Sequence, residues 1–141
     1  MTTSLERRVG VSTHFLPSTY GETLDDAVKI VSDAGIECFE LVPIGQAQIG
    51  YPYNYPNVGL WPRSLSEMDR KILKDLLSVF DLCTVHGPHL DLNIASYNLG
   101  IREESIKQNM ECMKLAADLN IEIVTFHMGG KTWGYIGTLK R

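Results

Sequence analysis

Short apolar runs alternate with amphipathic helical segments along most of the chain, and this alternation limits the available folds more than any other feature. The runs are apolar on both faces, which is typical of parallel strands covered by helices. Strands are predicted at residues 9–15, 38–42, 82–85 and 122–126. Because each connection between them is long enough for a parallel crossover, the sequence predicts an α/β protein with a parallel sheet.

Capping signals predict three helices between these strands. Residues 23–26 form a capping box that opens the first helix, and Gly35 stands at its end. A second box, at residues 64–67, is expected to open the next helix, and the third is expected over residues 102–119. The apolar spacing predicts that the residues facing the core are Leu24, Ala27, Val28, Val31, Met68, Ile72, Leu76, Val79 or Phe80, Ile106, Met110, Met113 and Ala117.

Composition excludes several classes of protein. The net charge is −4 and no Lys/Arg cluster occurs, so a nucleic-acid partner is not expected. No apolar run reaches the roughly 20 residues of a membrane span and no signal peptide is apparent, so no membrane partner is expected either. The cysteines Cys38, Cys83 and Cys112 show no CxxC spacing. They predict buried thiols in a reducing compartment, which indicates a cytoplasmic protein.

Polar residues gather where the predicted strands end. All four histidines, His14, His86, His89 and His127, lie at or just after a strand terminus, and Glu40 lies near another. Ligands of parallel α/β proteins bind at this edge of the sheet, so the pattern predicts a pocket for a divalent metal or a sugar. For His14 or His89 taken singly, a hydrogen-bonded structural role is the alternative.

Two further polar residues, Glu40 and Asn93, each have two possible roles. Glu40 interrupts an otherwise apolar strand, so it is expected either to face a polar pocket or to pair with a cation. Asn93 lies in the run HLDLN after the third strand. It is a candidate pocket residue, with a turn or capping role as the alternative.

The segment 43–63 is a long connection that contains four prolines, three glycines and three tyrosines. Loops of this length in compact domains are often functional covers. Its aromatic rings suit the apolar faces of sugars, so we consider it a possible lid. The alternative is an insertion whose aromatic residues pack only on one another.

The absence of GxGxxG and P-loop motifs leaves two parallel architectures, a flavodoxin-like open sheet and a (βα)8 barrel. Residues 85–96, VHGPHLDLNIAS, followed by residues 102–105, REES, and 124–129, VTFHMG, resemble the xylose isomerase-like TIM-barrel superfamily. Members of that superfamily typically show H-x-P-x-L-D-L-N-x-A-S, and their fourth strand ends in H-P-G. Met128 stands here in place of that proline. The resemblance therefore favours a TIM barrel.

The resemblance implies that His86 and His127 face the barrel mouth as candidate metal ligands. In endonuclease IV-like members, histidines at these positions bind one of several zinc ions. In epimerase-like members the ligands of a single ion come mainly from later strands, and these histidines lie near the substrate. The run HGPHLDLN is more similar to the second group, which implies a sugar or sugar-phosphate substrate. The pattern of polar residues at the strand ends itself makes His14, Glu40, His89 and Asn93 the candidate pocket residues. The metal could be Zn, Mn, Mg or Co.

Whole enzymes of this kind abstract a proton next to a carbonyl, or shift a hydride, while a divalent ion polarises the substrate oxygens. A complete barrel has eight βα units in about 250 residues, whereas these 141 residues provide about four. We therefore expect one partial domain over residues 1–141, the N-terminal half of an isomerase or epimerase that is inactive alone, with no assignable catalytic acid or base. The alternatives are a half-barrel binding or assembly module, which pairs with itself or with a C-terminal half, and a fragment of a zinc-dependent apurinic endonuclease.

Overall fold

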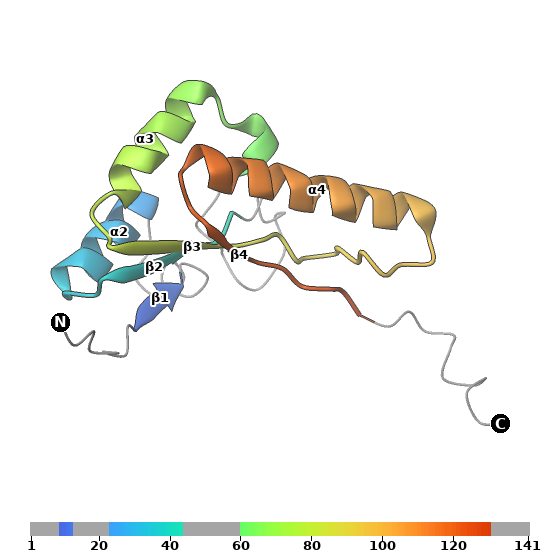
Figure 1. Ribbon diagram of the computed structural model, residues 1–141, viewed down its shortest axis with the longest axis horizontal. Coiled ribbons are helices and arrows are strands. Elements are labelled where there is room, and N and C mark those ends of the chain that lie inside the picture. Colours follow the sequence, from blue (N-terminus) through green and yellow to red (C-terminus); the bar gives the residue numbers. More distant parts are fainter. Residues whose placement is uncertain (1–8, 13–22, 44–59, 131–141) are drawn as a thin grey trace, which may run out of the picture.

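The computed structural model describes residues 9–12, 23–43 and 60–130. In this part of the chain, strands and helices alternate as predicted (Figure 1). The elements in chain order are β1 (Gly10–Ser12), α2 (Leu24–Asp33), β2 (Cys38–Leu41), the 3₁₀ turn η1 (Pro62–Ser64), α3 (Glu67–Leu77), β3 (Leu82–His86), α4 (Leu99–Asp118) and β4 (Ile123–Thr125). None of the helices described here is long and apolar enough to cross a membrane.

The order of the strands decides between the two parallel architectures. The sheet has the order β1-β2-β3-β4, and each strand pairs in parallel with the next one in the sequence. A flavodoxin-like sheet would place the first strand between the second and the third. A TIM barrel keeps its strands in chain order. The chain is therefore the first half of a TIM barrel, with the sheet open between β1 and β4 in the described part of the protein.

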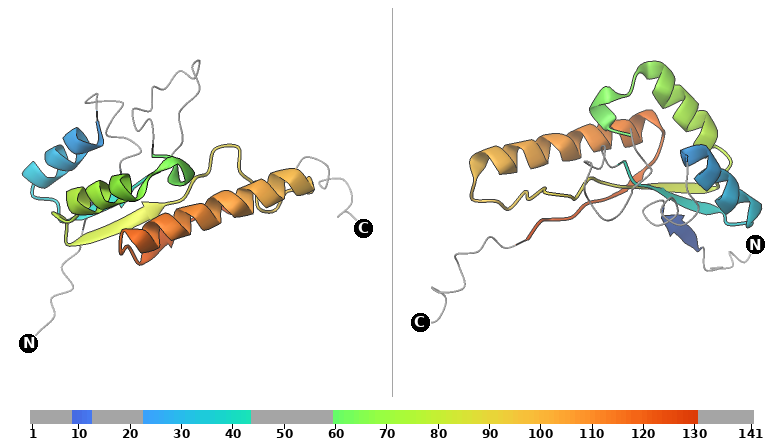
Figure 2. Two further views of the ribbon diagram at one scale, coloured as in Figure 1. Left: turned by 90° about the horizontal axis from the view of Figure 1, so that it is seen from above. Right: turned by 180° about the vertical axis from the view of Figure 1, so that it is seen from behind.

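The two faces of the sheet have different roles. Phe39, Leu41 and Val85 are buried against the helices in one apolar core, and the Phe39 ring stacks on Phe80 with centroids 4.6 Å apart. Because side chains alternate along a strand, the residues between them face the opposite side, which is the interior of a barrel. The three helices follow one another along the core side (Figure 2). The remaining buried members of the core are Val28, Val31, Leu73, Leu77, Cys112, Leu115, Ala116, Leu119 and Ile121.

The helix ends confirm one capping prediction and correct another. Thr23 caps α2 and forms the expected box with Asp26, and Gly35 follows the helix with φ +71°. The box of α3 is Ser66 with Asp69, not residues 64–67, because Ser64 belongs to η1. The helix α4 begins at Leu99, earlier than predicted, because the Asn98 side chain accepts hydrogen bonds from the first backbone N–H groups.

The predicted inward faces of α3 and α4 are wrong in part. The prediction is confirmed in α2, where Ala27, Val28 and Val31 are buried. In α3 and α4 the buried stripe is rotated by about one residue, to positions such as Leu73 and Cys112. Both helices carry apolar residues on two adjacent stripes, so spacing alone does not identify the stripe that meets the sheet. The residues predicted to be buried that are exposed instead are Met68, Ile72, Ile106, Met110, Met113 and Ala117. Of the predicted alternatives Val79 and Phe80, Phe80 is the buried one.

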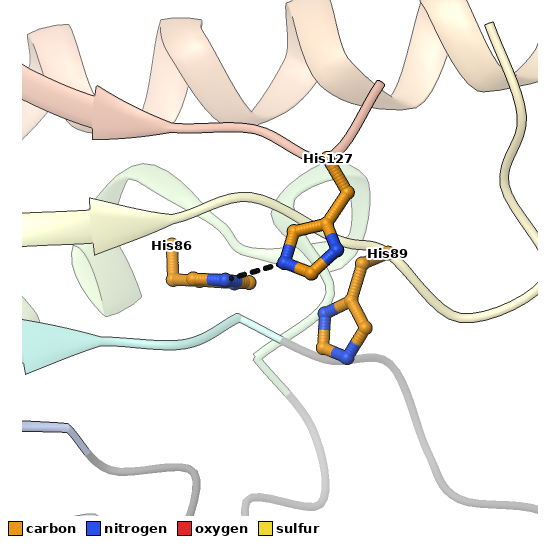
Figure 3. Close-up of side chains that lie close together, drawn as sticks. All are labelled: His86, His89 and His127. Carbon is orange, nitrogen blue, oxygen red and sulfur yellow. Dashed lines mark hydrogen bonds between the residues drawn. The ribbon is translucent and has the colours of Figure 1, made fainter. Parts of the chain in front are cut away.

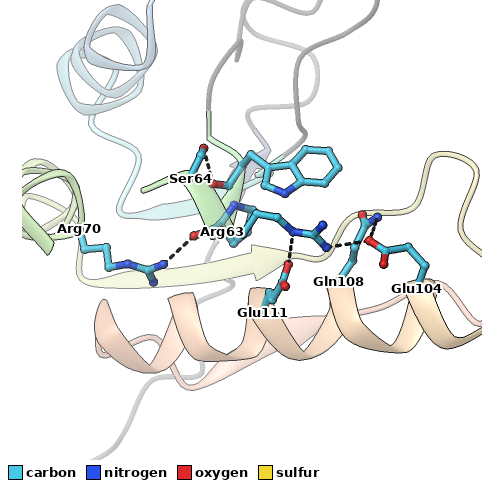
Figure 4. Close-up of polar contacts among 8 residues, drawn as sticks. Arg63, Ser64, Arg70, Glu104, Gln108 and Glu111 are labelled. Carbon is cyan, nitrogen blue, oxygen red and sulfur yellow. Dashed lines mark hydrogen bonds and ion pairs between the residues drawn. The ribbon is translucent and has the colours of Figure 1, made fainter. Parts of the chain in front are cut away.

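Residues 44–59 of the proposed lid lie outside the described residues, but its final turn is fixed on α4 (Figure 4). Arg63 donates from Nε to Glu111 and from Nη2 to Glu104, each at 2.7 Å. The hydrogen bond from Arg63 holds the pKa of Glu104 below its usual value. Arg70 ties the same turn to the helices, with Nη2 donating to the carbonyl of Pro62 at 2.6 Å.

Candidate metal centre

Three histidines meet at the carboxyl edge of the sheet (Figure 3). His86 is the last residue of β3, and His127 lies two residues beyond β4. His89 lies three residues after His86 in the loop, before the turn at Leu90 and Asp91. Their ring centroids are 4.9 to 5.1 Å apart in all three pairs. The structure therefore brings together three of the predicted site residues.

The ligating nitrogens of this cluster lie within reach of one ion. One ligand atom from each histidine can be chosen so that all three lie within 4.8 Å of one another. Nε2 of His86 and Nε2 of His127 are 3.0 Å apart. A tetrahedral ion with metal–nitrogen bonds of about 2.0–2.1 Å holds neighbouring nitrogens roughly 3.3 Å apart. The separation of this pair is thus already close to that of two ligands.

The hydrogen bonds indicate the tautomer of His86. Its Nδ1 lies 3.1 Å from the carbonyl oxygen of Gly87. A carbonyl can only accept, so Nδ1 carries the hydrogen in this contact and the neutral ring keeps a lone pair on Nε2. That lone pair then accepts the N–H of His127 across the 3.0 Å contact. A backbone carbonyl on the other ring nitrogen is a common support for a metal-binding histidine.

Gly87 keeps the ends of β3 and β4 side by side. Its N–H donates to the carbonyl of Thr125 at 2.8 Å, which extends the strand pairing one residue past His86. The Phe126 ring occupies the space that a Cβ on Gly87 would need. The absence of a side chain at this residue therefore lets His86 and His127 approach each other.

Asn93 connects the loop after β3 to the loop after β4. Its Nδ2 donates to the carbonyl of Gly130 at 2.8 Å, while its Oδ1 accepts from the N–H of Ala95 at 2.9 Å. The buried Ser105 on α4 accepts from the backbone N–H of Asn93 at 2.8 Å. Asn93 therefore positions the loops that carry His89 and His127. Its predicted pocket role stays a prediction.

The other predicted pocket residues are not part of this cluster. His14 lies outside the described residues. Glu40 is half-buried on the interior face of β2, level with Ser12 on β1 and Thr84 on β3. Among the described residues, the groups of His, Cys, Asp and Glu that could hold an ion comprise only the three histidines. Glu40 is thus placed in the barrel wall, and its role in binding stays a prediction.

His89 was predicted to belong to the substrate pocket, and its contact with both other histidines was not predicted. The spacing His86-x-x-His89, directly after a predicted strand end, was the available signal. Three imidazoles can hold a divalent ion and leave a fourth ligand position for water or substrate.

A sequence model of the xylose isomerase-like TIM barrel family matches residues 28–138. This chain belongs to that family. The match covers both strand ends that carry the histidines, so the predicted family and the predicted first half of a barrel are confirmed.

Similar proteins extend beyond the length of this chain. The uncharacterized protein MJ1188 of Methanocaldococcus jannaschii is 27% identical over 127 residues, which cover 86% of this chain and 39% of that protein. A crystal structure of a D-tagatose 3-epimerase-like protein matches with TM-score 0.63 and 22% identity, over 92% of this chain and 40% of that one. The TTHB071 protein from Thermus thermophilus, soaked with ZnCl2, matches with TM-score 0.48 and 16% identity, over 89% and 41%. The chain therefore spans about two fifths of the length of these relatives.

Proposed function

We propose that this chain supplies the N-terminal half of a divalent-metal-dependent isomerase or epimerase acting on a sugar or a sugar phosphate. The supporting observation is the meeting of His86, His89 and His127 at the carboxyl edge of the sheet in a member of the xylose isomerase-like family. In TIM barrels this edge carries the active site. The family and the donor set together support a metal-dependent enzyme.

The residues of this half bind and orient rather than transfer the proton. His86 and His127 hold the ion in this proposal, and Asn93 fixes the loops on which His89 and His127 lie. A bound divalent ion supplies Lewis-acid polarisation of the substrate oxygens. Glu40 is the one carboxylate within the four described strands, and it faces the barrel interior beside the proposed substrate site. The catalytic acid and base are expected from the remaining strands, so this half is inactive alone.

The proposed partner is a polypeptide that carries the second half of the barrel. The described sheet ends at β4, where Ile123 is half-exposed, and α4 beside it exposes Ile106, Met110 and Met113. An open parallel strand edge with exposed apolar neighbours favours association with another polypeptide segment. This chain matches its relatives over about two fifths of their length, so those proteins are long enough to include the second half of a barrel.

The test compares this chain with a fusion of the same chain to strands five to eight of a complete relative. Both are incubated in D2O with Zn²⁺, Mn²⁺, Mg²⁺ or Co²⁺ and a panel of ketoses and ketose phosphates, and proton NMR follows exchange next to the carbonyl. The fusion is expected to give exchange or epimer formation, and the chain alone is not. A folded, metal-loaded fusion that leaves the whole panel unchanged would contradict the proposal.

One observation favours a second candidate, a fragment of a zinc-dependent apurinic endonuclease. The 3.0 Å approach of His86 to His127 suits two ligands of one zinc ion, as the resemblance to endonuclease IV-like members implies. The net charge of −4 favours the sugar substrate instead, because a DNA-binding surface is normally basic. Cleavage of a duplex with an abasic site by the zinc-loaded fusion, without activity on ketoses, would select the endonuclease.

A further inference from the structure

We infer that His89 is the third ligand of a divalent-metal site that this half-barrel builds by itself. The inference deepens the proposed function, because it assigns the ligands and the class of ion of the same site. The sequence resemblance concerned only the histidines at the two strand ends. The third imidazole comes from the loop after β3, where the His89 ring contacts both other histidine rings.

The position of His89 relative to both other rings supports this assignment. Its ring is stacked on His127 with centroids 4.9 Å apart and meets His86 edge-on at 5.1 Å. The three ligating nitrogens lie within 4.8 Å of one another, whereas tetrahedral ligands are roughly 3.3 Å apart. Closing this difference takes a movement of at most about 1.5 Å, which side-chain rotation of an imidazole on a loop supplies.

The loop that carries His89 is held on both sides. Before it, Gly87 pairs with Thr125 in the extended ladder. After it, Asn93 bonds to Gly130 and to Ser105. A ligand set held by such outer contacts loses less entropy when it binds an ion than a set on free loops. The chain therefore preorganises a three-histidine site without any residue of the second half.

The donor set selects the class of ion. All three ligands are imidazole nitrogens, and no carboxylate joins the cluster among the described residues. Imidazole suits Zn²⁺, Co²⁺ and related transition metals, whereas Mg²⁺ and Ca²⁺ prefer oxygen ligands. Of the four ions that the sequence leaves open, the site is expected to bind Zn²⁺ and Co²⁺ and to reject Mg²⁺. Three imidazoles fill three of the four positions of a tetrahedral ion, so the fourth position takes water or a substrate oxygen.

The test measures metal binding by the purified chain after metal removal. Zn²⁺ affinity is measured by competition with a coloured chelator, Co²⁺ coordination by its visible absorption, and Mg²⁺ binding by calorimetry. His86→Ala, His89→Ala and His127→Ala are each expected to weaken Zn²⁺ binding more than about 100-fold, beyond the usual effect of losing an outer partner. Leu90→Ala and Met128→Ala remove exposed neighbours of two ligands and are expected to leave affinity within about twofold.

A second measurement does not depend on how the variants fold. Long-range proton–nitrogen NMR spectra of the wild-type chain are recorded with and without one equivalent of Zn²⁺, and three imidazoles are expected to change their nitrogen shifts. Unchanged nitrogen chemical shifts of His89, or wild-type Zn²⁺ affinity of a folded His89→Ala variant, would overturn the role of His89 as a ligand. A wild-type chain that binds neither Zn²⁺ nor Co²⁺ would overturn the self-sufficient site. Ketose exchange by the fusion would still support the proposed function in either case.

Discussion

The side chain of Asn93 joins two loops that are far apart in the sequence, and a glycine makes this contact possible. Gly129 has φ +89°, a conformation that residues with a Cβ rarely adopt. A Cβ at this position would lie 2.3 Å from Oδ1 of Asn93. The next residue, Gly130, has open space around the corresponding position and a backbone that accepts the Asn93 hydrogen bond. These neighbouring glycines therefore differ sharply in their tolerance of a methyl group.

We predict that Gly129→Ala weakens Zn²⁺ binding by about tenfold or more, because it displaces Asn93 and with it the loop that carries His127. Gly130→Ala is the matched control and is expected to keep the wild-type affinity. Chelator competition measures both. Equal Zn²⁺ affinities of the two variants would show that the contact between Asn93 and Gly129 does not position the site.

A buried thiol makes a second residue-scale prediction. Cys112 has no exposed surface, and burial raises the pKa of its thiol to about 12. An unfolded thiol ionises near pH 8.5, so the folded state binds this proton more tightly. Its contribution to the free energy of unfolding is complete below about pH 8.5 and is lost as the pH rises toward 12. The loss is about 1.4 kcal/mol per pH unit within that window.

Urea unfolding of wild type and Cys112→Ala between pH 8 and 11, with a reducing agent present, measures this loss. The wild type is expected to lose stability more steeply with pH than the variant, by about 1 kcal/mol per pH unit. The variant is less stable at pH 8 because it has a small cavity, so the slopes are compared rather than the absolute values. Parallel slopes would show that Cys112 ionises equally easily in the folded chain.

At the scale of elements, the start of α3 is where sequence and structure differ most clearly. Two serines stand near it, and both are plausible caps. The Ser66 hydroxyl accepts from the N–H of Asp69 at 3.1 Å and donates to its carboxylate at 2.6 Å. The Ser64 hydroxyl donates instead to the carbonyl of Trp61 at 3.0 Å, within the preceding turn.

We predict that Ser66→Ala lowers the free energy of unfolding by about 1 kcal/mol, the usual effect of losing an N-cap. Ser64→Ala, two residues away, is expected to lower the free energy of unfolding by only a few tenths of a kcal/mol, because it removes one exposed hydrogen bond outside the helix. Urea unfolding followed by circular dichroism compares the two. A larger loss for Ser64→Ala would place the helix start where the sequence alone had suggested.

The strands, the family and the positions of His86 and His127 were predictable because each depends on local sequence. Apolar runs define strands, and polar residues at their ends define the active edge. The burial of Leu73 rather than Ile72 was not predictable, because the neighbours of a helix, not its own spacing, choose between adjacent apolar stripes. The links of Asn93 to Gly130 and of Arg63 to Glu111 were also hidden, since both join segments distant in the chain.

At the scale of the whole molecule, α4 contacts the last strand of the open sheet and exposes an apolar stripe. Met110 and Met113 are 49% and 45% exposed, and Ile123 on β4 is 49% exposed. Surface of this kind favours association with another polypeptide. The second half of a barrel would cover it in a complete enzyme, and in the isolated chain another copy can reach the same surface.

We predict that the isolated chain self-associates as its concentration rises, and that Met110→Lys combined with Met113→Lys shifts it toward monomer, because charge on this stripe opposes burial. Ile30→Lys, an apolar-to-charged change at an exposed position on α2, is the matched control and is expected to associate as the wild type does. Sedimentation velocity over a range of concentrations measures the change. A wild-type chain that stays monomeric throughout would contradict the prediction.

The pairing of every strand with its immediate predecessor has a consequence for the order of events during synthesis. Contacts between successive segments have short loops to close, so β2, β3 and β4 can each dock onto a sheet that already exists when they leave the ribosome. The three histidines are all present once residue 127 has emerged. The proposed three-histidine site is therefore complete once β4 has docked, and its assembly needs no strand beyond β4.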